Sequence, residues 1–206
     1  MKKLILITVP LLIGSFLFAQ SPQIVAECTV SFTISVSGGS ENAMNNAAKT
    51  LFIKGRQARV DVTGPSFKQS VIYDNNTGVA VILREIGGSK YISTLDSSKW
   101  KDQNKQYDGM ALTLTNETKA ILGYECKKAI AKLKNGNTFS MYYATAIKPS
   151  ATENPYQFKD LPGFVLEYES EKEGSTQKVT YTANKINLNP VPVAMFEVPS
   201  KGYRIL

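Results

Sequence analysis

The chain has 206 residues, 43% of them hydrophobic, and a formal net charge of +7, which suits one domain with a sizeable core. Its lysines are scattered and join no Arg-rich or aromatic motif, so the charge does not indicate nucleic-acid binding. Histidine is absent from the sequence, which excludes a Ser-His-Asp triad and the commonest zinc ligand.

The first residues predict an export signal. Two lysines precede an apolar run that ends at Phe18, and Ala19 supplies a small residue for cleavage. The run is short for a membrane span of about 20 residues. We therefore expect a signal peptide at 1–19 and a single β domain at 20–206, periplasmic or secreted, and peripheral to the envelope without spanning the membrane.

The clearest strand pattern follows the leader. "CTVSFTISV", residues 28–36, alternates apolar and polar side chains, which is typical of a strand with one wet face. "KTLFIKG" and "QARVDVTG" then predict a hairpin that turns around Gly55.

Residues 70–95 predict three meandering antiparallel strands, separated by "NNTG" and "GGS" turns. In the middle strand Val81 and Leu83 point to one face, while Ala80 and Ile82 point to the other. This part of the sheet is therefore apolar on both sides. Something else in the chain must cover one of them.

"LDSSKWKDQNKQYDGM" breaks the strand pattern. Asp96 or Ser97 can cap a helix with a narrow apolar stripe that contains Trp100 and Tyr107. One interpretation is a surface helix held by a single aromatic anchor. The other is a lid across an apolar concavity, with Trp100 as its plug.

Strands resume after the helix. "NGN" at 135–137 predicts a hairpin, and a proline-bearing loop then leads through Leu161, Pro162 and Gly163 into the strand "FVLEYESE". Four alternating glutamates at 167–173 predict a wet strand face that lysines of a neighbouring strand could balance. A Ca²⁺ site or a carboxylate hydrolase there is the weaker alternative. The tail, rich in Pro, Phe and Tyr, is expected to fasten the C-terminus.

The two cysteines lie in separate predicted strands. In an oxidising compartment Cys28 and Cys126 could pair if those strands lie close, and we expect a disulfide between them. The alternative is a pair of buried free thiols on separate faces.

"FKDLPGFVLEYES", preceded by "GYECKKAIAKLKNGNTFSMYYA" and followed by "FEVPSKGYRIL", resembles the GLPGLI family of exported proteins and a related family of uncharacterised domains in Gram-negative envelopes. Asp160 replaces the first glycine of the motif, and the Leu-Pro-Gly that follows is intact. The resemblance implies a fold similar to the LolA-like lipoprotein carriers.

The predicted fold class is mainly β: a curved, incompletely closed antiparallel sheet, or half-barrel, with one or two short helices on its concave side. We expect a non-enzymatic protein without catalytic residues, metal or cofactor, which binds a lipid, acyl chain or lipoprotein in the concavity. The alternative is a structural or protein-interaction module of the envelope. The motif loop Leu161–Gly163 would lie at the mouth of the cavity, and its candidate lining residues are Trp100, Tyr107, Val81, Leu83, Phe164 and Leu166.

Overall fold

The computed structural model describes residues 21–37, 47–171 and 178–206. The predicted signal peptide at 1–19 lies outside this part of the chain. The strands are β1 (Gln23–Val25), β2 (Glu27–Ser37), β3 (Ala48–Lys54), β4 (Gln57–Thr63), β5 (Phe67–Asp74), β6 (Ala80–Ile86), β7 (Ser89–Leu95), β8 (Ala111–Ile121), β9 (Tyr124–Lys132), β10 (Thr138–Ala144), β11 (Ile147–Pro149), β12 (Phe164–Glu171), β13 (Lys178–Asn187) and β14 (Arg204–Ile205). The helical elements are α1 (Ser97–Gln103) and the 3₁₀ turns η1 (Lys105–Tyr107) and η2 (Val193–Phe196).

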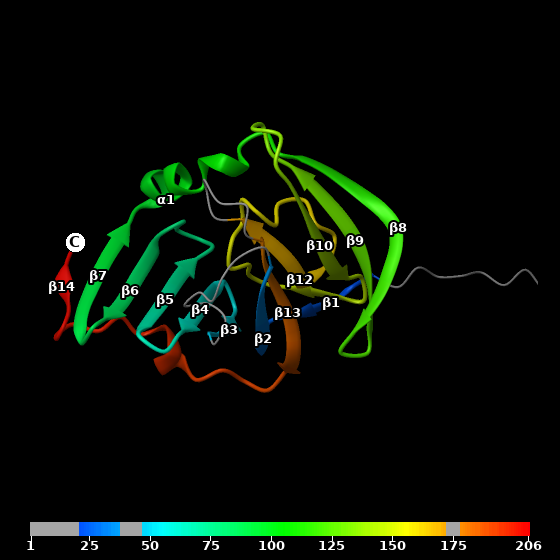
Figure 1. Cartoon of the computed structure of the whole chain (residues 1–206). Helices are drawn as coiled ribbons and strands as arrows, with labels where there is room; N and C mark the ends of the chain where they lie inside the picture. Colours follow the sequence, from blue (N-terminus) through cyan, green and yellow to red (C-terminus); the bar gives the residue numbers. More distant parts are fainter. Residues whose placement is uncertain (1–20, 38–46, 172–177) are drawn as a thin grey trace, which may run out of the picture.

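Twelve strands form one sheet in the order β14-β7-β6-β5-β4-β3-β2-β13-β12-β10-β9-β8. Neighbours in this sheet are antiparallel except β14 and β7, which run parallel, and β1 and β11 form a separate parallel pair. Figure 1 shows the large sheet as one continuous curved surface from β7 to β8, with α1 at one end of β7. None of the helices in the described ranges is long and apolar enough to cross a membrane.

The prediction of a mainly β fold is confirmed, but the half-barrel of the lipoprotein carriers is wrong. The sheet is mixed, because the chain end returns parallel to β7, and it does not close, because β14 and β8 lie at its two edges. Short helices cover only part of the concave side, where Trp100 of α1 packs against Tyr73, Ala80 and Ile82. An irregular segment, residues 150–163, lies over it, and Trp100 is the buried residue of α1.

Strand alternation places the core on the inner face of the sheet. The alternating side chains of β2 are buried there, and the register continues this face into β3, where Phe32 lies opposite Lys49 and Val30 opposite Leu51. Across β12 and β10 the same face carries Tyr168 opposite Met141. The main hydrophobic cluster therefore spans the sheet from β4 to β8.

The outer face is covered in part by the tail. Val191 and Phe196 are buried against Ile72, with Val81 packed beside them. The Arg59 guanidinium donates to the carbonyl oxygen of Met195 at 2.5 Å. The tail thus covers the second apolar face of the meander and, as expected, is fastened, since β14 pairs with β7.

Charged pairs cover another part of the outer face. Lys119 forms an ion pair with Glu167 at 2.7 Å, and Lys178 one with Glu169 at 3.7 Å. The prediction that lysines of a neighbouring strand balance the glutamates is confirmed for Glu169, because Lys178 lies on the adjacent β13, whereas the partner of Glu167 comes from β8, beyond β10 and β9. The side chains of 171–177 lie outside the described residues.

The predicted disulfide is wrong, because Cys28 and Cys126 carry free thiols, both buried. Strands β13, β12 and β10 lie between β2 and β9. At about 4.8 Å per strand this is roughly 19 Å along the sheet, whereas a disulfide needs Cα atoms about 4.4–6.8 Å apart. Burial raises the pKa of Cys28 to about 12 and that of Cys126 to about 11, so both stay thiols at neutral pH.

Candidate functional site

The segment 150–163 crosses the inner face of the sheet and defines the site. The Asn75 side chain donates to the Thr152 carbonyl oxygen at 3.2 Å, and Ser150 Oγ donates to the Gly55 carbonyl oxygen at 2.6 Å. The Asn154 side chain donates to Asn104 Oδ1 at 2.9 Å. These contacts fix the segment to the β3–β4 and β5–β6 turns and to the end of α1.

The Leu-Pro-Gly motif ends this segment. Asp160 adopts a φ of 62°, a left-handed conformation that favours glycine. Gly163 lies so close to the Ala144 carbonyl oxygen that a Cβ atom would collide with it. The motif therefore makes a tight turn that brings Phe164 into register with Ala144.

A cavity of about 540 Å³ lies between this segment and the sheet. Leu51 and Ile53 of β3 form part of its wall, Arg56 and Asn75 contribute polar groups, and the rest comes from 148–153, Pro155 and 158–165. Its wall thus combines apolar side chains with charged and amide groups.

A buried cation lies at the centre of the inner face. Lys49 is only 2% exposed, and its Nζ lies 2.7 Å from Glu153 Oε1. It also donates to the Tyr168 hydroxyl. The rings of Phe32, Tyr168 and Tyr181 surround the ammonium, with centroids 4.7, 4.6 and 5.0 Å away.

Burial shifts the ionisation of this cluster. Loss of water lowers the pKa of Lys49, and Glu153 opposes part of that shift. Burial raises the pKa of Tyr168 well above its ordinary value of 10.0 and that of Tyr181 to about 12. The phenols are therefore neutral hydrogen-bonding groups at physiological pH.

A smaller cavity of about 160 Å³ adjoins Lys49. Three valines, Val60, Val62 and Val71, form one wall, and Trp100, Glu153, Asn154, Gln157 and the two tyrosines form the rest. Asp96 caps α1, because its carboxylate accepts from the Lys99 N–H at 2.9 Å. The helix carries Trp100 into this cavity, where its ring centroid lies 5.9 Å from that of Tyr73.

In the structure, the predicted cavity residues lie in three different cavities, in the core and on the outer face of the sheet. Trp100 lines the smaller cavity, Phe164 and the motif loop Leu161–Gly163 line the larger one, and Leu166 is fully buried in the core. Tyr107 lines a third cavity, of about 440 Å³, together with Met110 and Tyr156. Val81 and Leu83 are not brought to these cavities, because they point to the outer face.

Sequence analysis missed Lys49, Glu153, Tyr168 and Tyr181. The signal for Lys49 was present, since it alternates with Leu51 and Ile53 and so shares their inner face. Glu153 lies in an irregular segment and carries no periodic signal.

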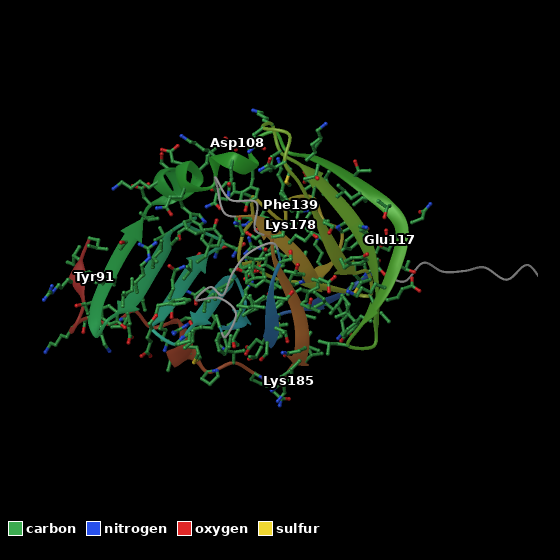
Figure 2. All side chains as sticks on the ribbon, viewed as in Figure 1. Tyr91, Asp108, Glu117, Phe139, Lys178 and Lys185 are labelled. Atoms are coloured by element: carbon green, nitrogen blue, oxygen red, sulfur yellow. The ribbon has the colours of Figure 1, made fainter. Side chains whose placement is uncertain are left out.

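The two faces of the sheet can be followed in Figure 2, where Phe139 lies within the bend of the sheet, whereas Glu117 and Lys185 project away from it.

Comparison with known families identifies the relationship. A family model described as "N-glycanase peptide, N-terminal domain" matches residues 42–194. No curated protein matches the chain. The predicted resemblance to the GLPGLI family is therefore corrected: a Leu-Pro-Gly turn before a strand is a local geometry and does not fix a family.

Solved structures show the same fold. Two crystal forms of PNGF-II superpose with TM-scores of 0.51 and 0.53, at 12% and 13% identity, over 87% and 88% of this chain. The match covers 30% and 31% of the length of the two PNGF-II chains, so this chain spans about a third of PNGF-II. An uncharacterized conserved protein from Thermus thermophilus superposes with a TM-score of 0.54 at 7% identity, over 88% of this chain and 90% of its own.

Proposed function

Because the chain belongs to the family of the N-glycanase N-terminal domain, we propose that it is an exported, non-catalytic domain that binds the glycan part of glycoproteins. Export is supported by the leader-like sequence at 1–19. The glycan is inferred from the family's name together with the larger cavity.

The 540 Å³ cavity is the observation that carries this proposal. Its volume falls in the range of about 300–1,000 Å³ that is typical of small-molecule sites. Sugars present both hydroxyl groups and apolar C–H surfaces, and the cavity offers partners for both. Arg56 and Asn75 provide donors, while Leu161 and Phe164 provide apolar contacts.

The lipid ligand expected from the sequence is less well supported. An acyl chain needs a long apolar channel, but the inner face is packed with the main hydrophobic cluster and covered by 150–163. The carboxylate nearest the centre, Glu153, is held by Lys49. That ion pair gives Glu153 a structural task, which supports a binding role over a catalytic one.

The test is calorimetric titration of the chain with an N-glycopeptide, the same peptide without its glycan, and a fatty acid. Of these three ligands, we expect only the glycopeptide to show saturable binding. Arg56→Ala should weaken it about tenfold, as is typical of a lost hydrogen bond to a charged group. Arg84→Ala, on β6 and outside the cavity lining, is the control. Equal binding of both peptides, or binding of the fatty acid alone, would refute the proposal.

A further inference from the structure

Lys49 and Glu153 place an amine beside a carboxyl group in the interior of the protein. Lys49 Nζ lies 2.7 Å from Glu153 Oε1, and the two side chains are only 2% and 9% exposed. The carboxyl carbon Cδ, which an amine would attack, is one bond beyond Oε1. Groups held in place in this way react as if each were present at about 10⁵–10⁸ M.

The surroundings of Lys49 favour an uncharged amine. The rings of Phe32, Tyr168 and Tyr181 face its Nζ. Burial lowers the pKa of Lys49, although Glu153 opposes part of that shift. A lysine that has lost its proton is a nucleophile, and removal from water in an apolar pocket is one way in which proteins activate it.

The carboxylate of Glu153 is incompletely satisfied as an ion. Its second oxygen, Oε2, is buried and has no hydrogen-bond partner among the described residues. A buried ion pair offsets its loss of hydration only when the remaining lone pairs are also hydrogen-bonded. An amide has no net charge, so the same missing partner costs it less. This environment therefore favours a neutral amide over the two ions.

We propose that Lys49 and Glu153 condense into an intramolecular isopeptide bond. A proton of Nζ passes to Oε1 along their hydrogen bond, and the amine then attacks Cδ. A second proton of Nζ also passes to Oε1, the bond between Cδ and Oε1 breaks, and Oε1 leaves as water. The product is a neutral amide that keeps Oε2 as its carbonyl oxygen and retains one N–H. No oxidant or other reactant is required.

Two neighbouring features support this step. The Tyr168 hydroxyl accepts a hydrogen bond from Nζ, so it orients the amine before the attack and can accept from the amide N–H afterwards. The 160 Å³ cavity, which Lys49 and Glu153 both line, can receive the released water, since a water molecule occupies about 30 Å³.

The bond would join two distant parts of the chain. Lys49 and Glu153 are 104 residues apart, so the amide would tie the segment 150–163 covalently to β3. In the linked protein Lys49 carries no charge, and its ionisation then concerns only the unlinked chain. The bond needs no ligand, so it forms whether or not the larger cavity binds a glycan.

Mass spectrometry of the purified, unfolded full chain tests the proposal. We expect an intact mass that is lower by one water than the sequence requires, and a pair of tryptic peptides joined through Lys49 and Glu153. Lys49→Arg keeps the cation, but its guanidinium stays protonated, so this variant should show the full mass. The wild-type spectra are decisive even if the variant does not fold.

The chain also contains an internal control. Lys54 and Glu27 form an ion pair at 2.9 Å, but their side chains are 27% and 32% exposed, so we expect them to remain separate. The proposal would be overturned by a full wild-type mass after several days at neutral pH, or by a loss of water without the peptide pair joined through Lys49 and Glu153.

The rate of linkage tests the role of Tyr168 as a positioning residue. Tyr168→Phe removes the hydroxyl that orients Nζ and should slow the appearance of the joined peptides about tenfold, as expected for one lost hydrogen bond. Tyr181→Phe keeps its ring beside Lys49 and should leave the rate unchanged. Equal rates in the two variants would contradict the positioning role of Tyr168.

Discussion

At the scale of single residues, the buried Lys49 has a large energetic consequence. A lysine in the apolar face of a strand is costly unless its charge is paired. Here Glu153 supplies the counter-charge, and three aromatic faces add cation–π attraction. The ion pair also joins 150–163 to the sheet, so it fixes the roof of both cavities.

Replacing Lys49 by methionine should therefore be strongly destabilising. Lys49→Met leaves Glu153 buried and unpaired, and we expect a loss of about 3–5 kcal/mol in the free energy of unfolding, measured in urea. The double variant Lys49→Met/Glu153→Gln should recover most of it. Lys90→Met, whose ion pair with Glu85 is more exposed, is the control. A single-variant loss similar to that of the control would contradict this prediction.

The buried thiols and phenol predict an alkaline loss of stability. Burial raises the pKa of Cys28 from 9.0 to about 12, that of Cys126 from 9.0 to about 11, and that of Tyr181 from 10.0 to about 12. A raised pKa means that the folded state holds its proton longer than the unfolded chain. These groups therefore stabilise the fold fully below pH 9, and their contribution falls as the pH rises to about 12.

Lys49 acts in the opposite direction. Burial lowers its pKa, so the unfolded chain keeps that proton to higher pH, and folding gains stability as the pH rises toward 10.5. Urea titrations between pH 8 and 11 measure the balance. We expect the free energy of unfolding to fall across this interval, and to fall less in Cys28→Ala. A rise in both proteins would show that Lys49 outweighs the other groups.

At the scale of elements, the turn at 160–163 shows how a short motif shapes a site. Asp160 holds a left-handed conformation, so Asp160→Gly should raise the free energy of unfolding by up to about 1 kcal/mol. Gly163→Ala should lower it by about 1–3 kcal/mol, because the new methyl group meets the Ala144 carbonyl oxygen. Thermal or urea unfolding compares the two variants. Changes of the same sign would contradict this account of the turn.

The strands show what alternation can and cannot predict. The pattern of 28–36 correctly identified a strand with one buried face, and Asp96 was correctly named as a possible helix cap. In 79–83 both faces are apolar, so the pattern could not say which one lines a cavity; the structure places Ala80 and Ile82 inside. Alternation assigns a face to each side chain but does not identify what covers that face.

At the scale of the whole molecule, the tail stabilises the sheet from outside. It returns from β13 across β3–β6 and places Phe196, 7% exposed, against Ile72. Phe196→Ala should therefore cost about 3 kcal/mol in the free energy of unfolding, measured in urea. Val198→Ala, at a residue that is 45% exposed, should change it by less than about 0.5 kcal/mol. Similar effects of both variants would contradict the covering role of the tail.

The sequence predicted the mainly β class but not the sheet order. Strand β14 lies more than a hundred residues from β7, and its two residues carry no pattern that names a partner. The site depends on the same kind of distant contact, since Lys49 and Glu153 come from separate parts of the chain. The GLPGLI resemblance was wrong because it rested on local turn geometry, which unrelated sheets can share.

The rates at which the two separated thiols react can report on local opening of the sheet. Cys28 on β2 and Cys126 on β9 are both fully buried, so a thiol reagent can modify either one only after its own strand has come away from its neighbours. Mass spectrometry of the labelled peptides would time the two openings independently. A large difference between the two rates would mean that the region near the β8 edge, where β9 lies, and the middle of the sheet, where β2 lies, open independently.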